Sequence, residues 1–141
     1  MPDAAGQRGS GPATPAGRVL ALDVGTQRVG VAVGSPLSAP QPLATLPAGA
    51  LPTVLEPLLR EWQPAALVLG LPLNVDGGET VMSRRVRALG RRLRRQCGLA
   101  VHFHNEYLSS HAAPRGQAAG RAGRDAQAAA LILAGWLEAQ A

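Results

Sequence analysis

Three acidic side chains in this sequence are of the kind that holds a divalent metal ion. Asp23 ends the apolar run VLAL, Glu106 follows the strand-like stretch LAVHFHN, and Asp125 stands before the Ala- and Leu-rich C-terminal segment. An ionised carboxylate at the end of a buried strand is unfavourable unless a positive charge or hydrogen bonds compensate it. If the fold brings the three acids together, a cation would relieve their mutual repulsion. Because such a site offers only oxygen ligands, it predicts Mg²⁺ or Mn²⁺ as the cofactor.

Each of the three acids also has an ordinary structural interpretation, and the sequence leaves both open. Asp23 could accept hydrogen bonds from turn amides, Glu106 could lie on a loop surface, and Asp125 could cap a helix or complement its dipole. His102 and His104 would share a strand face with Glu106 if the strand continues that far. We interpret this histidine pair as strand surface rather than as metal ligands.

The positive charge of the chain is concentrated in one segment. All 14 basic residues are arginines, against nine acidic residues, and seven of the arginines lie between residues 84 and 95. At about 100° per residue, the apolar side chains of this segment gather on one side of a helix, opposite the arginines. These apolar residues are Met82, Val86, Leu89, Leu93 and Cys97. Because no acid is interleaved to relieve the repulsion, the stripe favours an anionic partner such as nucleic acid, and the alternative is a solvated helix face.

A carboxylate-bound metal beside a basic surface is suited to phosphodiester hydrolysis. The metal lowers the pKa of a bound water to generate a nucleophile, and arginines hold the phosphates. We therefore predict that the three acids are both catalytic and metal-binding. Contacts to nucleic acid are predicted for Arg28, Asn74, Arg84, Arg87, Arg91, Arg92, Arg94, Arg95, Arg115, Arg121 and Arg124. For Asn74, which lies in the loop LPLNVDGGE, a purely structural role in the turn is the alternative.

The hydrophobic pattern predicts a mixed α/β sheet flanked by helices. Strands are expected at 19–23, 29–34, 41–47, 66–70 and 99–103, and helices at 51–62, 80–97 and 125–140. The first two strands form an antiparallel hairpin, the third is an edge strand, and the later strands are parallel. Residues 1–17, rich in Gly, Pro and Ala, are expected to form a disordered tail, which leaves 18–141 as a single domain.

Composition narrows the class of protein. No apolar run approaches the roughly 20 residues that span a bilayer, and the N-terminus lacks the apolar core of a secretory signal. Cys97 is the single cysteine, which excludes an intramolecular disulfide and a cysteine-built zinc site. These features predict a cytoplasmic protein without a membrane partner.

Four blocks resemble, in order, the motifs of the YqgF/RuvX family, an RNase H-like group of pre-16S rRNA nucleases and Holliday-junction resolvase homologues. They are LDVGTQRVGVAV, VLGLPLNVDG, NEYLSS and DAQAAALILAGWL, which together span about residues 18–138. The resemblance implies an RNase H-like fold and a divalent-metal nuclease. It places Asp23, Glu106 and Asp125 at the positions of the family's three acids, and Arg28 in its hairpin motif.

The resemblance leaves the substrate and the assembly open. Asn105 and Tyr107 replace an acid and a base of the family's D-E-R-L-S-T block, and the segment between Glu106 and Asp125 is short, which affects substrate geometry. The substrate is either the leader of a ribosomal RNA precursor, at the 5' end of pre-16S rRNA, or branched DNA. A four-way junction requires two active sites and hence a homodimer, whereas a monomer suffices for trimming RNA.

Two other classes of function remain as alternatives. A non-catalytic module that binds nucleic acid or the ribosome could keep the same shape. The DVGT stretch also resembles the first phosphate loop of actin-like nucleotide-binding proteins. Those proteins need a second lobe and a second Gly-rich loop, and this 141-residue chain provides neither.

Overall fold

A computed structural model of the chain describes residues 17–105 and 120–140, and it contains one five-stranded sheet in the order β3-β2-β1-β4-β5. The strands are β1 (Val19–Val24), β2 (Arg28–Ser35), β3 (Ser38–Pro47), β4 (Ala66–Leu71) and β5 (Ala100–Asn105). β2 pairs antiparallel with β1 and β3, whereas β4 runs parallel to β1 and β5. The predicted mixed sheet, with its hairpin start and its third strand at the edge, is confirmed.

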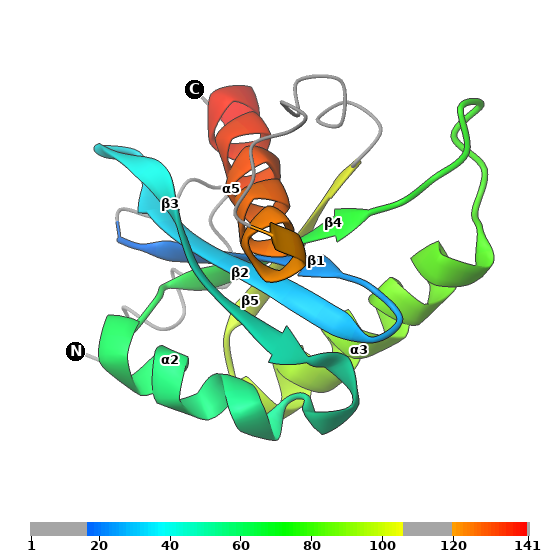
Figure 1. Ribbon diagram of the computed structural model, residues 1–141. Helices are drawn as coiled ribbons and strands as arrows, with labels where there is room; N and C mark the ends of the chain where they lie inside the picture. Colours follow the sequence, from blue (N-terminus) through cyan, green and yellow to red (C-terminus); the bar gives the residue numbers. More distant parts are fainter. Residues whose placement is uncertain (1–16, 106–119, 141) are drawn as a thin grey trace.

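Helices cover both faces of this sheet (Figure 1). The helix α5 (Gly120–Gln140) lies on one face, and α2 (Glu56–Trp62) and α3 (Val81–Cys97) lie on the other. Two short 3₁₀ helices, η1 (Ala48–Ala50) and η2 (Thr53–Leu55), precede α2. Among residues 17–105 and 120–140, no helix is both long and apolar enough to cross a membrane.

The central strand β1 is apolar on both faces because helices cover both. Leu20 and Leu22 belong to the core cluster that includes α3, whereas Val19 and Ala21 pack in the cluster with Trp136 of α5. Side chains alternate between the two faces of a strand. The next residue of the second set is Asp23, and the alternation therefore places this half-buried acid on the α5 face.

Small residues on β2 allow the backbone of α5 to lie close to the sheet. The valines of β2 face the α3 side, and Gly30, Ala32 and Gly34 alternate with them on the α5 side. A Cβ at Gly30 would overlap the backbone carbonyl of Asp125, and one at Gly34 would lie 3.0 Å from a methyl group of Leu133. The glycines thus set the separation between α5 and β2.

Two predicted helix starts were wrong. The helix expected from residue 51 is α-helical only from Glu56, because Pro52 and Pro57 lack the amide hydrogens that a longer helix would need and Pro57 fits the first turn. The last helix begins at Gly120 rather than at Asp125. Alanine and arginine favour helix between these positions, and one glycine costs only about 1 kcal/mol there. Asp125 therefore does not cap a helix.

The remaining boundaries differ by a few residues from the predicted ones. β5 extends to Asn105, two residues beyond its expected end, so that His104 lies within the strand. On α3, Val86, Leu89 and Leu93 are buried as expected, and Ser83 and Gly90 are buried beside them. Residues 1–16 of the expected disordered tail lie outside the described residues.

We expect Gly30→Ala to destabilise the protein by about 2–3 kcal/mol, because the added methyl group overlaps the backbone of α5 and forces the helix away from the sheet. Gly49→Ala is the control, since a Cβ at that position meets nothing within 4 Å. Urea denaturation of both variants measures the difference. Equal stability of the two variants would show that α5 does not depend on this contact.

Candidate functional site

The structure brings two of the three predicted acids to one corner of the sheet. Asp23, near the carboxyl end of β1, pairs in the antiparallel ladder with Gly30 of β2. Gly30 lies directly beneath the backbone of Asp125. Both acids are half-buried, and Asp23 points to the face of the sheet that α5 covers. The carboxyl ends of the parallel strands, where α/β folds place ligands, thus carry an acid from the sheet and an acid from the helix.

Arg28 is bound to one of these acids. Its Nε donates a hydrogen bond to Oδ2 of Asp125 over 2.7 Å, and the two side chains are 36% and 26% exposed. Arg28 was predicted to contact nucleic acid, and here it is the counter-ion of a predicted metal ligand. No local sequence pattern indicates this pair, because its members are 97 residues apart.

A hollow of about 390 Å³ lies beside this ion pair. It is lined by the hairpin turn Gly25, Thr26 and Gln27, together with Arg28 and Asp125. The turn is held by backbone hydrogen bonds, from the amide of Gly25 to the carbonyl of Arg28 and from the amide of Ala48 to the carbonyl of Gln27, both 2.9 Å. An anionic group of a substrate could therefore enter a preformed space next to the guanidinium.

The third predicted acid, Glu106, lies outside the described residues. β5 ends one residue before it, with Asn105 opposite Leu71 of β4. Within the described ranges 17–105 and 120–140, no group of three His, Cys, Asp or Glu side chains could hold a metal ion. The predicted three-acid site therefore stays a prediction, of which two members are placed.

The two histidines of β5 lie on the α5 face of the sheet. His102 packs on Trp136 with 5.0 Å between ring centroids, and alternation places His104 on the same side. Burial lowers the pKa of His102, with Arg94 adding to the effect, and burial also lowers the pKa of His104. The packing of His102 agrees with its interpretation as part of the strand surface.

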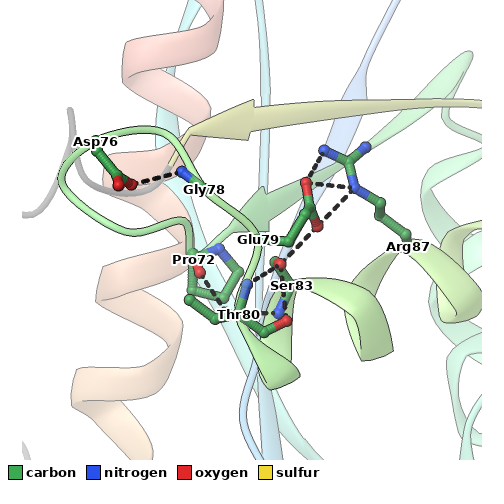
Figure 2. A network of polar contacts seen from close by, with 7 residues as sticks. All are labelled: Pro72, Asp76, Gly78, Glu79, Thr80, Ser83 and Arg87. Carbon is green, nitrogen blue, oxygen red and sulfur yellow. Dashed lines mark hydrogen bonds and ion pairs between the residues drawn. The ribbon is translucent and has the colours of Figure 1, made fainter.

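The loop that carries Asn74 is tightly hydrogen-bonded (Figure 2). The amide of Asn74 donates to the carbonyl of Gly78, and the amide of Gly77 donates back to the carbonyl of Asn74. Asp76 accepts a hydrogen bond from the amide of Gly78 over 2.8 Å. Gly77 has a φ of 89°, a conformation that favours glycine. The backbone of Asn74 thus has the structural role in the turn, and its side chain is exposed.

A polar network joins this loop to the first turn of α3. Thr80 caps the helix by accepting from the amide of Ser83, and its hydroxyl donates to the carbonyl of Pro72. The buried hydroxyl of Ser83 donates to Glu79, whose carboxylate also binds Arg87 over 2.8 Å (Figure 2). Glu79 is a residue that the sequence analysis missed. The available signal was its position directly before the capping pattern T-x-x-S.

The arginines of α3 fall into two groups. Three of them have partners within the protein: Arg87 binds Glu79 and lies over the ring of Phe103, Arg92 donates to the carbonyl of Leu51, and Arg94 donates to the carbonyl of Val101. The other four, Arg84, Arg85, Arg91 and Arg95, are exposed. The predicted stripe is therefore real, but part of its charge serves the fold.

Two of the remaining predicted nucleic-acid contacts, Arg121 and Arg124, belong to the first turns of α5. Arg124 is exposed on this helix. Arg121 belongs to the helix but its side chain is not among those described, and Arg115 lies outside the described residues.

The chain is similar to proteins of one family over nearly its whole length. The model of the family RuvX, described as Holliday junction resolvase, matches residues 17–139. A protein of Pseudomonas aeruginosa strain PAO1 named "Putative pre-16S rRNA nuclease" is 43% identical over 130 residues, which cover 84% of this chain and 90% of that protein. A Pseudomonas putida protein of the same name is 41% identical over 134 residues, covering 86% and 94%.

Solved structures show the same fold at low sequence identity. RuvC of Thermus thermophilus is similar with a TM-score of 0.55 and 16% identity, covering 86% of this chain and 96% of that one. The yeast mitochondrial Holliday junction resolvase gives a TM-score of 0.51 and 14% identity, covering 99% and 85%. The predicted RNase H-like fold is confirmed.

The network around Glu79 predicts a specific pH dependence of stability. The hydrogen bonds from Arg87 and Ser83 lower the pKa of Glu79 from 4.5 to about 2. Because the pKa in the folded state lies below that in the unfolded state, ionised Glu79 stabilises the fold above pH 4.5, and this contribution is lost as the pH falls toward about 2. Glu79→Gln should flatten the fall in stability over this range, measured by urea denaturation at successive pH values.

The matched control is Glu56→Gln, which removes a carboxylate whose ion pair with Arg60 spans 3.7 Å at the exposed surface of α2. This variant should keep the acid dependence of the parent. If Glu79→Gln kept it as well, the network would contribute nothing to the folded state.

Proposed function

The chain belongs to the RuvX family, and from that premise we propose that it is a divalent-metal-dependent endonuclease that hydrolyses phosphodiester bonds of structured nucleic acid. The observation that carries the proposal is the meeting of Asp23 and Asp125 on one face of the sheet, above Gly30. Two half-buried acids at this edge, with an arginine-rich helix on the opposite face of the same sheet (Figure 1), match the needs of a metal-assisted nuclease. A match over residues 17–139 also favours a nuclease over an actin-like nucleotide-binding protein.

The substrate that we propose first is the 5' end of pre-16S rRNA. The relatives that are 41–43% identical carry pre-16S rRNA in their name, whereas the two solved resolvases are only 14–16% identical and support the fold alone. Branched DNA is the second candidate, because the family model is described as a Holliday junction resolvase. RNA trimming requires only a monomer and would place the chain in the cytoplasm. A resolvase would act as a homodimer.

Asp23 and Asp125 would hold Mg²⁺ or Mn²⁺, with Glu106 as the third predicted ligand. Carboxylate oxygens are the donors that these cations prefer, so the residues present fit the cofactor. A bound cation of this kind supplies an activated water and neutralises charge on the phosphate. The close contact at Gly30 fixes the distance between the backbone of Asp125 and the sheet. The fold of the chain thereby sets where this predicted ligand lies relative to β2.

The exposed arginines of α3 would bind the phosphate backbone. At about 100° per residue, Arg84, Arg91 and Arg95 lie within about 40° of one another on the helix surface, in a row about 16 Å long. The helix follows the loop at the carboxyl end of β4, so Arg84 is the member closest to the candidate site. A row of guanidinium groups that leads away from the acids is suited to binding a strand on one side of the scissile bond.

Asp23→Asn should lower the rate of Mn²⁺-dependent cleavage by about 100-fold or more, because it removes one ionised ligand and leaves the fold intact. Binding of nucleic acid, measured by fluorescence anisotropy in EDTA, should stay within about twofold of the parent, since the arginines carry it. Glu61→Gln, which changes an exposed acid of α2, is the control and should cleave normally.

The test measures cleavage of two substrates by the protein, a pre-16S rRNA leader and a DNA four-way junction. Each substrate is incubated with Mg²⁺ and with Mn²⁺ in parallel. Cleavage of one substrate by the parent, lost in Asp23→Asn, supports the proposal. A protein that binds both but cleaves neither with either metal would instead be the non-catalytic binding module. Full cleavage by Asp23→Asn would remove this acid from the mechanism.

The combined substitution of Arg84, Arg91 and Arg95 by Ala should reduce the dependence of affinity on salt. Each duplex phosphate contact contributes about 0.9 to the slope of log K against log salt, so the loss of three contacts should lower the slope by about 2–3. Arg60→Ala is the control, because Arg60 is an exposed arginine of α2. An unchanged slope in the triple variant would mean that the row is solvated surface.

A further inference from the structure

We propose that Arg28 is a built-in counter-ion of the metal site, which releases Asp125 when metal and nucleic acid bind together. The inference rests on the proposed function and adds a coupling between the cofactor and the substrate. In the state that the structure describes, the guanidinium holds Oδ2 of Asp125 over 2.7 Å. In the second state, the carboxylate binds the cation and the same guanidinium binds a substrate phosphate.

Two acids and one arginine share this corner of the sheet. Asp23 and Asp125 lie on the same face, and Arg28 is on that face too, since it has the same parity as Gly30 and Ala32 along β2 and alternates with the valines. One guanidinium next to Asp125 reduces the repulsion between the two acids when no cation is bound. A divalent cation would compete with Arg28 for the same carboxylate and would repel the guanidinium. Arg28 therefore weakens the binding of metal in the absence of substrate.

The side chain of Arg28 has open space beside it into which it can move. Its side chain is 36% exposed, and the hollow of about 390 Å³ beside it is bordered by the exposed turn Gly25, Thr26 and Gln27. A long, flexible side chain at the rim of an open hollow can change rotamer without disturbing the core. A phosphate in this hollow would accept two parallel hydrogen bonds from the guanidinium, a geometry that suits arginine better than lysine.

The backbone of Asp125 is held by packing that does not involve Arg28. The backbone of Asp125 rests on Gly30, and Ala126, Ala129 and Ile132 of the same helix are buried. The position of the Asp125 backbone thus depends on packing and not on the ion pair with Arg28. Release of the ion pair exposes a ligand that is already in position.

A thermodynamic consequence follows from these two states. Because phosphate binding stabilises the released state of Arg28, nucleic acid raises the affinity for metal, and metal must raise the affinity for nucleic acid by the same factor. The site would then bind the cation firmly only when a substrate is present.

The test is the affinity for Mn²⁺, measured by electron paramagnetic resonance on the full chain without nucleic acid. Arg28→Met keeps the apolar length of the side chain and removes the charge, and it should bind Mn²⁺ at least about fivefold more tightly than the parent. Arg28→Lys keeps the charge and should stay within about twofold of the parent. Arg60→Met, on the far helix α2, is the control for a change in net charge.

The coupling is measured as the ratio of affinities for a phosphorothioate hairpin RNA with and without Mn²⁺, after correction for Mn²⁺ bound by the RNA alone. The parent should show a ratio of about five or more, and Arg28→Met a ratio near one. Equal Mn²⁺ affinity in the parent and Arg28→Met would overturn the inference but leave the metal site intact. Absence of Mn²⁺ binding in every variant, with and without RNA, would overturn the proposed function as well.

Discussion

The close contact between the backbone of α5 and the glycines of β2 is the constraint on which the candidate site depends. A side chain at Gly30 would occupy the space of the Asp125 carbonyl, so the absence of a Cβ there determines how near the helix comes to the sheet. Asp23 lies opposite Gly30 in the ladder. The contact therefore brings an acid from the first strand and an acid from the last helix to one corner, although about a hundred residues separate them in the sequence.

Ion pairs within the protein reduce the electrostatic repulsion between the acids at this corner and between the arginines along α3. Arg28 binds Asp125, and Arg87 binds Glu79, which also accepts a hydrogen bond from the buried Ser83. Each of these charge-assisted bonds joins a residue at the start of an element, Arg28 of β2 or Glu79 before α3, to a residue inside a helix. Arg84, Arg85, Arg91 and Arg95 of α3 remain exposed at the surface.

The elements around the site are ordered by their own hydrogen bonds. The hairpin turn at residues 25–28 is closed by backbone bonds, and the loop at residues 72–79 is closed by its own turn and joined to α3 through Thr80 (Figure 2). Such preorganised loops reduce the entropy that is lost when a substrate binds. The side chain that our proposal allows to move, Arg28, lies on this fixed framework.

The sequence by itself determined the order of the strands and helices, the hairpin start and the apolar side of α3, because hydrophobic periodicity and turn residues are local signals. It also identified Asp23 and Asp125 as candidate ligands from their positions next to apolar segments and from family motifs. The starts of α2 and α5 were less predictable. Prolines and glycines near Glu56 and Gly120 disfavour helix locally, and tertiary packing decides whether the helix forms there anyway. Only the tertiary structure decided that Arg28 holds Asp125 and that Arg87 holds Glu79. Such pairs depend on how distant elements pack, and no local pattern in one sequence encodes which arginine meets which acid.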